Sequence, residues 1–277
     1  MRQKLFMVDC GEGTQMQLRR SHIRFLNIRC VFISHLHGDH CFGLVGMLST
    51  FGMLGRTMPL HIYAPTDMEP LLALEKQLFL QGLTYEVVFH GVDTKTQKVV
   101  YEDRSLTVET LPLHHRVPCC GYLFREKPTL PHIRRDMIDY LNIPFSQINN
   151  IKNGADWTTE DGKTISNNRL VLTADAPRSY AYCSDTCYLP KLHERIKGVN
   201  LLYHESTYAS DYPERAKKFF HSTSQQAAQV ARDAGAGQLL LGHYSARYDN
   251  EQQLLEEARQ IFPNSFLTDE GAVFDVK

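Results

Sequence analysis

Residues 31–40 read Val31-Phe32-Ile33-Ser34-His35-Leu36-His37-Gly38-Asp39-His40. The apolar first half is typical of a buried strand, so His35, His37, Asp39 and His40 stand at the C-terminal end of that strand. In α/β folds this is where sites are usually built. Alternation along an extended turn would point His35 and His37 the same way, while Asp39 and His40 serve a neighbouring position. The sequence therefore predicts that one motif supplies ligands to two metal ions.

The residue types in this motif indicate the kind of metal. Imidazole and carboxylate groups are the ligands expected for zinc at catalytic sites, and they also accept manganese or iron. None of the cysteines falls inside the motif, as a closed structural zinc site would require. The alternative is a histidine-rich surface turn, which the interleaved aspartate and the preceding apolar strand disfavour.

Length and composition bound the class of protein. The chain has 277 residues, 43% of them hydrophobic, which predicts a single large domain over residues 1–277. Its 30 Lys and Arg balance 31 Asp and Glu, so any nucleic-acid-binding surface must be local. No apolar run approaches the roughly 20 residues of a membrane-spanning helix, and no secretory leader precedes the first strand. We therefore expect a cytoplasmic protein without a membrane partner. The seven scattered cysteines indicate reduced, buried side chains and no disulfide framework.

Short apolar runs alternate with amphipathic stretches along most of the chain. This pattern predicts an α/β fold of mixed sheets with helices on their outer faces. Residues Thr66 and Glu69 are spaced as a capping box that opens a helix through Gln81, and Ser222 with Gln225 repeats the spacing. We expect strands at residues 31–34, 60–63, 85–89, 106–111, 121–124, 179–183, 201–203, 238–241 and 272–276, and a helix at residues 43–54.

The segment from about residue 125 to 168 breaks this rhythm. It is polar, contains three prolines and lacks sustained periodicity, so we expect an inserted, protruding arm that binds a partner. Arg125, Lys127, Arg134 and Arg135 could contact phosphates there. Acidic residues lie among them, and a solvated loop of mixed charge is the alternative.

A site with two metal ions needs further ligands, and three other strand ends offer them. His114 and His115 follow one predicted strand, Asp185 another and His243 a third. Each alone would be interpreted as a capping or core hydrogen-bonding residue. Their joint occurrence with the first motif favours the metal site.

The motif at His35–His40 resembles the His-x-His-x-Asp-His pattern of the metallo-β-lactamase superfamily, and the whole chain from about Phe6 onward resembles the ribonuclease Z family. The first resemblance implies an αββα sandwich. The segments that carry the second are Phe6-Met7-Val8-Asp9-Cys10-Gly11-Glu12-Gly13-Thr14-Gln15, His115 with Gly121-Tyr122, Ser184-Asp185-Thr186, His204-Glu205-Ser206-Thr207, His221-Ser222-Thr223 and Gly242-His243-Tyr244-Ser245-Ala246-Arg247-Tyr248.

The resemblance implies two zinc ions and assigns their ligands residue by residue. His115 is chosen over His114 because the ligand in the family has the spacing that His115 has to Gly121. Asp185 would bridge the two ions. One ion would be held by His35, His37 and His115, and the other by Asp39, His40 and His243.

The resemblance also implies roles in hydrolysis. Asp39 would orient the attacking water and accept its proton, and His221, held by Glu205, would protonate the departing ribose oxygen. The alternative for Glu205 and His221 is a structural hydrogen-bond network. The substrate implied is a tRNA precursor, cut after the discriminator nucleotide to leave a 3′-hydroxyl on the tRNA. The family also implies a homodimer in which each arm reaches tRNA bound at the partner's site.

Two departures and two rival functions accompany this prediction. Related proteins begin with an extra strand and a glycine-rich loop before the segment at Asp9, so the first N-terminal strand is expected to be missing here. The arm lacks the Gly-Pro tip of the subgroup and reads Ile143-Pro144-Phe145-Ser146-Gln147-Ile148.

One rival function is that of a hydrolase or phosphodiesterase of the same fold acting on a small molecule. The other, a non-catalytic RNA-binding subunit, is disfavoured because all seven predicted ligands are present.

Overall fold

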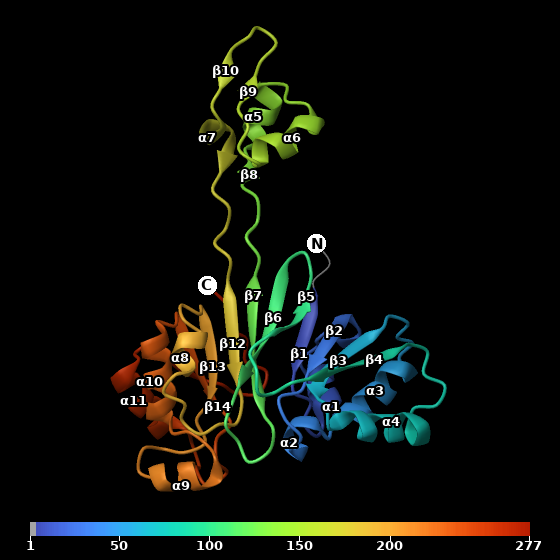
Figure 1. Cartoon of the computed structure of the whole chain (residues 1–277), viewed down its shortest axis with the longest axis vertical. Helices are drawn as coiled ribbons and strands as arrows, with labels where there is room; N and C mark the ends of the chain where they lie inside the picture. Colours follow the sequence, from blue (N-terminus) through green and yellow to red (C-terminus); the bar gives the residue numbers. More distant parts are fainter. Residues whose placement is uncertain (1–3) are drawn as a thin grey trace. The chain divides into compact units, whose positions relative to one another are not determined.

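The computed structural model describes residues 4–277, and its contacts divide the chain into two compact units (Figure 1). Unit 1 comprises Met1–Glu102, Thr107–Phe124 and Ser179–Lys277. Unit 2 comprises Asp103–Leu106 and Arg125–Arg178. Unit 2 thus includes the segment expected to form an arm and extends to Arg178. The organisation as one domain with an inserted arm stays a prediction.

Unit 1 is built on two sheets. The four-stranded sheet has the order β1-β2-β3-β4, and its neighbouring strands are parallel throughout, where mixed sheets were expected. The seven-stranded sheet has the order β15-β14-β13-β12-β7-β6-β5 and is mixed, with parallel pairs from β12 to β15 and an antiparallel β5–β6 pair. The first sheet contains β1 (Leu5–Val8), β2 (Ile28–Phe32), β3 (Leu60–Pro65) and β4 (Val87–Val92). The second contains β5 (Val99–Glu102), β6 (Leu106–Pro112), β7 (Cys120–Glu126), β12 (Ser179–Cys183), β13 (Leu201–Glu205), β14 (Gln238–Gly242) and β15 (Ser265–Leu267).

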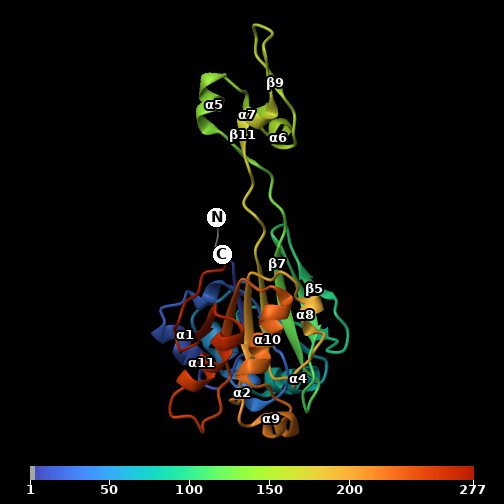
Figure 2. The same ribbon diagram turned by 90° about the vertical axis from the view of Figure 1, so that its left-hand side faces the viewer.

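Helices cover the outer faces of both sheets (Figures 1 and 2). On the smaller sheet α4 contacts β4 and α3, while on the larger sheet α10 contacts β13 and β14 and α11 contacts β15. This αββα arrangement confirms the predicted fold class. The helices of unit 1 are α1 (Thr14–Arg20), α2 (Gly38–Cys41), α3 (Leu44–Met53), α4 (Met68–Phe79), α8 (Leu192–Arg195), α9 (Pro213–Phe219), α10 (Ser224–Ala234) and α11 (Gln252–Ile261), with a short 3-10 helix at Phe25–Asn27.

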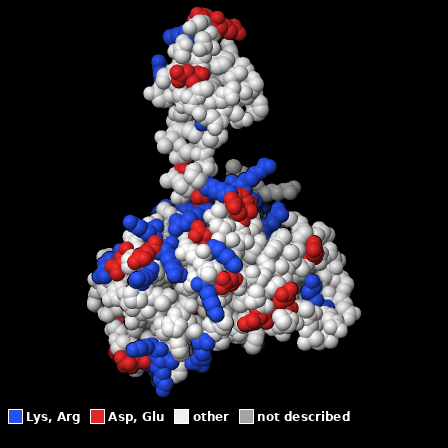
Figure 3. Space-filling view, viewed as in Figure 1, with Lys and Arg blue, Asp and Glu red and all other residues white. Residues whose placement is uncertain are grey.

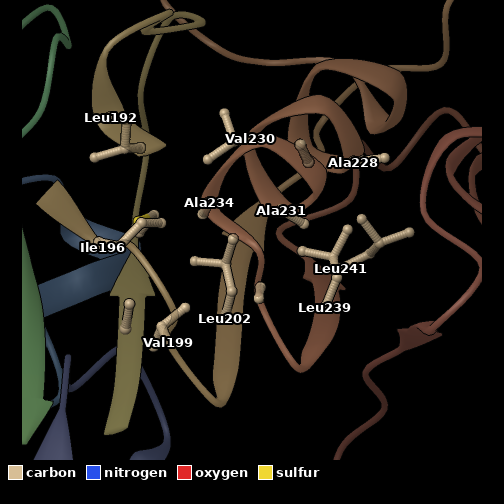
Figure 4. Packing of buried hydrophobic residues seen from close by; sticks show 14 of the residues in the cluster. Leu192, Ile196, Val199, Leu202, Ala228, Val230, Ala231, Ala234, Leu239 and Leu241 are labelled. Carbon is tan, nitrogen blue, oxygen red and sulfur yellow. The ribbon is translucent and has the colours of Figure 1, made fainter. Parts of the chain in front are cut away.

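Small side chains let α10 lie close to the larger sheet. Ala228, Ala231 and Ala234 pack in one buried cluster with Leu202 and Leu239 of the strands (Figure 4). Complete burial of each leucine contributes about 1.5–3 kcal/mol. The outer layer is therefore fixed to the strands whose ends carry candidate site residues.

Aromatic side chains fill the space between the two sheets. Phe32 of β2 stacks on Tyr63 of β3 with ring centroids 4.8 Å apart and also contacts Tyr122 of β7 at 5.1 Å. The fully buried Tyr122 hydroxyl donates to the Ile33 carbonyl at 2.7 Å, which satisfies its polar group. These contacts hold the end of β2, and so the histidine motif that follows it, against the larger sheet.

Most predicted strands are present with shifted ends, but the strand expected at residues 272–276 is wrong. The last strand is β15, and a turn follows it in which the Ala272 backbone nitrogen donates to Asp269 at 3.1 Å. Val273 is 90% exposed. This segment is apolar apart from Asp275, yet it does not extend the sheet.

Both predicted capping boxes are wrong. Thr223 caps α10 together with Gln226, because Thr223 Oγ1 accepts from the Gln226 nitrogen and the Gln226 side chain accepts from the Thr223 nitrogen. Ser222 instead donates to the Thr186 carbonyl at 2.8 Å. Helix α4 starts at Met68 without a side-chain cap and ends at Phe79.

Unit 2 contains only short elements. Its small core consists of Ile143, Ile151, Ile165 and Leu170. Helices of four to eight residues and two-residue strands are too short to show a periodic pattern, which explains why no element could be predicted there. They are β8 (His132–Ile133), α5 (Arg135–Tyr140), α6 (Phe145–Lys152), β9 (Trp157–Thr158), β10 (Thr164–Ile165), α7 (Asn167–Leu170) and β11 (Val171–Leu172).

No helix formed by residues 4–277 combines the length and hydrophobicity that crossing a lipid bilayer requires. All seven cysteines are free thiols, and all except Cys187 are buried, as the sequence predicted.

Candidate metal centre

Four predicted ligands converge on one point in unit 1. Potential ligand atoms of His35, His37, His115 and Asp185 all lie within 4.8 Å of one another. His37 Nδ1 is 3.1 Å from His35 Nε2 and 3.2 Å from His115 Nε2. Asp185 Oδ2 lies 3.7 Å from His35 Nε2 and 3.6 Å from His115 Nε2. The structure thus brings together residues from the ends of β2, β6 and β12.

A second group shares Asp185 with the first. Asp39 Oδ2 is 3.4 Å from His40 Nε2 and 3.6 Å from His243 Nε2. The other oxygen of Asp185, Oδ1, lies 3.5 Å from His40 Nε2 and 3.4 Å from His243 Nε2. The carboxylate of Asp185 therefore directs one oxygen to each group. His243 reaches the group from the end of β14, and Asp39 and His40 belong to α2.

Hydrogen bonds orient two of these histidines and determine their tautomers. His40 Nδ1 lies 2.8 Å from the Asp9 carboxylate, and His115 Nδ1 lies 2.9 Å from the Phe220 carbonyl. A carbonyl oxygen and an ionised carboxylate can only accept hydrogen bonds, so each Nδ1 carries the proton. The Nε2 atoms of both rings are left as lone-pair donors that face the centre.

The same reasoning applies to His35 and His243. Their Nδ1 atoms lie 2.9 Å from Ser34 Oγ and 3.0 Å from Thr207 Oγ1. Each hydroxyl lies within hydrogen-bond distance of a buried carboxylate, to which it gives its only proton. The hydroxyls therefore accept from Nδ1, and both Nε2 atoms are again available to a metal.

The residues present fit divalent cations. His40 Nε2 and Asp185 Oδ1 are buried atoms without a hydrogen-bond partner among the described residues. Buried lone pairs that face one another are costly unless a cation lies between them. The nitrogen separations of 3.1 and 3.2 Å around His37 also resemble the roughly 3.3 Å edge of a tetrahedron with zinc–nitrogen bonds of about 2.05 Å.

Burial and neighbouring charges set the protonation of the site. Burial, together with the nearby His40 and His115, lowers the pKa of His35 to about 2, so this ring is neutral and able to ligate. Burial also opposes the charged form of His243, but the hydrogen bond with Asp39 and the Asp185 carboxylate outweigh it and raise the His243 pKa to about 9. The same hydrogen bond lowers the pKa of Asp39. Without a cation, the positive charge of protonated His243 offsets negative charge on Asp39 and Asp185.

Three residues of the centre have a left-handed backbone. Asp9, Phe220 and His243 have φ values of 59°, 62° and 59°. For residues other than glycine this conformation costs roughly 1–2 kcal/mol each, and such strain clusters at functional sites. At Phe220 it ends α9 and leaves the carbonyl within reach of His115.

No role was predicted for Asp9, although it belongs to the segment Phe6–Gln15 that resembles the ribonuclease Z family. Asp9 accepts from Ser34, from Tyr182 and from His40. Glycine lets the backbone after Asp9 lie against the start of α3, because a Cβ on Gly43 would come within 1.8 Å of the Gly11 carbonyl oxygen. The Asp-Cys-Gly sequence directly after an apolar run was the available signal. Thr207 and the Phe220 carbonyl were also missed, and no sequence pattern indicates a backbone acceptor.

Glu205 and His221 form a pair beside the metal groups. His221 Nδ1 lies 2.9 Å from Glu205 Oε1, and the fully buried Glu205 also accepts from the backbone nitrogens of Thr186 and Thr207 at 3.0 Å. Burial would raise the pKa of Glu205, but the hydrogen bond with His221 outweighs it, and the carboxyl is ionised. The ring of His221 is stacked 5.3 Å from that of His243. Asp185, His221 and His243 also form a third possible ligand set, so His221 can be either a proton donor or a ligand.

The predicted phosphate-binding residues stand on two segments of the chain. Arg125 lies in β7 and Lys127 follows it, whereas Arg134 and Arg135 stand at the start of α5. Arg134 forms an ion pair with Asp136 at 2.8 Å. In unit 1, the ring of His114 contacts Phe220 and lies outside the ligand groups, which contain His115.

Comparisons with known proteins agree with this arrangement. A ribonuclease Z of Phocaeicola vulgatus is 55% identical over 98% of this chain and 87% of its own length, and one of Bacteroides fragilis is 53% identical over 98% and 89%. The chain belongs to the ribonuclease Z family. As a member of this family it is a hydrolase, an endoribonuclease of the metallo-β-lactamase fold.

Two solved structures have the same fold as this chain. The short form of human tRNase Z has a TM-score of 0.69 at 22% identity and covers 99% of this chain and 89% of its own. The metallo-β-lactamase fold protein YhfI of Bacillus subtilis has a TM-score of 0.63 at 18% identity, with 97% and 85% covered. A family model described as anti-Pycsar protein Apyc1 matches residues 1–128, which is less than half of the chain.

Proposed function

We propose that this chain removes the 3′ trailer from tRNA precursors by metal-dependent hydrolysis after the discriminator nucleotide, leaving a 3′-hydroxyl on the tRNA. The observation that carries the proposal is the Asp185 carboxylate between two ligand groups, with the Glu205–His221 pair beside them. The ribonuclease Z relatives at 50–55% identity support the substrate class.

Two zinc ions per chain would be held by residues that the structure gathers. His35, His37 and His115 would hold one ion, and Asp39, His40 and His243 the other, with Asp185 contacting both. When bound, such ions supply a water that is activated near neutral pH and positive charge for the phosphoryl oxygens. Manganese or another divalent ion can replace zinc at ligands of these types.

The chain's own residues account for the proton transfers. The carboxylate of Asp39, ionised because its pKa is lowered, accepts a proton from the attacking water. His221 gives a proton to the departing ribose oxygen, while Glu205 accepts a hydrogen bond from Nδ1 and holds the ring in place. The buried hydrogen bonds to Glu205 fix the position of this proton donor.

Unit 2 is proposed to bind the tRNA through Arg125, Lys127, Arg134 and Arg135. We also propose that the chain functions as a homodimer in which the inserted arm of one subunit contacts tRNA bound at the active site of the other.

A second candidate function is hydrolysis of a small phosphodiester. All the candidate ligands lie in unit 1, so this reaction would need no residue of unit 2. The same proton donor and ligands would serve either substrate.

Product mapping tests the proposed function. The purified protein is incubated with a labelled tRNA precursor carrying a 3′ trailer, after chelation and after addition of zinc or manganese, beside a small chromogenic phosphodiester. Metal-dependent cleavage directly after the discriminator, with a 3′-hydroxyl on the tRNA, is expected. Hydrolysis of the small phosphodiester with an intact precursor would support the second function instead.

A further inference from the structure

A cavity of about 560 Å³ lies in unit 1 next to the candidate metal centre. Helix α9 and the segments after β12 and α9 form its walls, and Tyr188, Lys217, Phe220 and His221 line it. Its volume falls within the range of small-ligand pockets, roughly 300–1,000 Å³. His221 is common to this cavity and to the metal-centre residues, since it also stacks on His243. The cavity therefore opens directly beside the proposed proton donor.

Hydrogen bonds fix the walls of this cavity. The Cys187 backbone nitrogen donates to the His114 carbonyl at 2.8 Å, and the His114 nitrogen donates to Thr186 Oγ1 at 3.1 Å. Phe220 is held by its left-handed backbone and by its carbonyl contact with His115. A ligand would thus enter a preformed pocket and need not order its walls.

The lining combines aromatic and charged side chains. Tyr188 and Phe220 offer flat apolar surfaces, and the His114 ring meets the Phe220 ring edge-on at 5.5 Å. Lys217 and Glu214 add a cation and a carboxylate at α9. Aromatic faces bind bases by stacking, an ammonium group binds phosphate, and a carboxylate accepts from base amino groups. This combination matches a nucleoside with its adjoining phosphate.

Positive charge continues along α9 outside the cavity. Arg215 and Lys218 are exposed, and both lie over the Phe219 ring, at 5.3 and 5.6 Å. Figure 3 shows Lys and Arg side chains gathered at the bottom of the view, where Figure 1 places α9. This surface favours the entry of a phosphate backbone.

The position of His221 decides which nucleoside the cavity takes. A proton donor must lie within hydrogen-bond reach of the oxygen that it protonates. In the proposed reaction that oxygen is the 3′-oxygen of the nucleotide upstream of the cut, so the ribose of this nucleotide must lie beside His221. Its base is then next to the cavity that His221 lines.

We propose that the cavity lined by Tyr188, Lys217 and Phe220 binds the nucleoside on the 5′ side of the scissile phosphate, the one that keeps the 3′-hydroxyl. The assignment of side rests on the proposed function. The base stacks on Tyr188 and Phe220, and the Lys217 ammonium contacts the phosphate that precedes this nucleoside.

Abasic substrates test which base is bound. For the unaltered chain, removal of the base upstream of the cut should lower kcat/KM about tenfold, as expected for the loss of one stacked base. In Tyr188→Ala the same removal should cost only about two- to threefold, because Phe220 alone is left to stack on the base, whereas Tyr188→Phe should behave as the unaltered chain. Removal of the base downstream of the cut should have the same effect in all three. Equal losses upstream in Tyr188→Ala and in the unaltered chain would overturn the proposal.

Phe79→Ala is the matched control, because Phe79 is an aromatic side chain that is 70% exposed on α4, away from the cavity. Bound zinc after reconstitution should equal that of the unaltered chain in both alanine variants. A loss of bound zinc in Tyr188→Ala would show a distorted centre and overturn the proposal.

Calorimetry keeps the cavity testable if the proposed function fails. Adenosine 5′-monophosphate is titrated into chelator-treated protein, with ribose 5-phosphate as the ligand that lacks a base. Binding of the nucleotide that is at least about tenfold tighter than that of the sugar phosphate, and is lost in Tyr188→Ala, supports a nucleoside site. Equal binding of the two ligands overturns it, whatever the chain does to RNA.

Discussion

The two units of this chain use their charged residues in opposite ways. In unit 1, Asp185 is 2% exposed and Glu205 is fully buried, and each contacts residues from different segments of the chain. In unit 2, Arg134 pairs with Asp136 two residues away at the surface. Burying a carboxylate is costly unless charges and hydrogen bonds compensate it, so the arrangement in unit 1 restricts its chemistry. Exposed pairs contribute little stability, so the charges of unit 2 impose no comparable restriction.

The two units also differ in their cores. The large sheet of unit 1 carries a buried cluster that extends from Leu111 to Ala258, whereas the core of unit 2 consists of four buried residues. A smaller buried core opens at a lower free energy. We therefore expect unit 2 to be the less stable part and the metal centre to be independent of it.

The largest expected effect concerns Asp185. Asp185→Asn removes the negative charge shared by the two ligand groups, and we expect loss of bound metal and a decrease of at least about 1,000-fold in RNA cleavage. Asp175→Asn, a matched change at a side chain that is 95% exposed in unit 2, should alter neither. Metal content and single-turnover rates measure both effects. Retention of both ions by Asp185→Asn would contradict the shared carboxylate.

The next largest effect separates the two roles possible for His221. His221→Ala should lower cleavage about 100- to 1,000-fold with metal content unchanged, because only the proton donor is lost. His193→Ala, at a histidine of α8 whose Nδ1 contacts the Pro190 carbonyl, is the control. Unchanged turnover would exclude the catalytic role, and a loss of metal would make His221 a ligand.

A core substitution in unit 2 tests the independence of the units. Leu170→Ala should destabilise residues 125–178 by about 2–4 kcal/mol, since it creates a cavity in a small core. Leu202→Ala should instead destabilise unit 1 by a similar amount. Hydrogen exchange locates each effect. A reduced metal content in Leu170→Ala would show that metal binding depends on the stability of unit 2, and would contradict the independence of the units.

The smallest expected effect concerns the exposed cations of unit 2. Arg135→Ala should raise KM for a tRNA precursor about two- to fivefold at low salt, with kcat unchanged, because one phosphate contact contributes modestly and is screened by salt. Leu172→Ala, at a side chain that is 57% exposed in the same unit, is the control. An unchanged KM at every salt concentration would remove Arg135 from the tRNA-binding surface.

Sequence patterns predicted the centre more completely than the arm. The candidate ligands of both groups stand at the ends of apolar strands, so the grouping of His35, His115, Asp185 and His243 could be predicted from strand position together with the family pattern. The residues that orient them could not, because the Phe220 carbonyl and the Thr207 hydroxyl act through tertiary contacts. Unit 2 has elements too short for a hydrophobic period.

The ends of strands and helices were also predicted at the wrong residues, because tertiary contacts determine them. The strand before the histidine motif ends at Phe32, because Ser34 turns its backbone nitrogen to Asp9 at 2.7 Å. The α10 cap moved from Ser222 to Thr223 because Ser222 is engaged by the Thr186 carbonyl. In both places a contact distant in sequence outweighs the local pattern.

Metal titration tests the central claim most directly. Chelator-treated protein is given zinc in steps, and bound zinc and cleavage of a tRNA precursor are measured in the same samples. Two ligand groups that share Asp185 predict that activity rises to a plateau at two zinc ions per chain. Cleavage by the metal-free protein, or a plateau without bound zinc, would contradict the account.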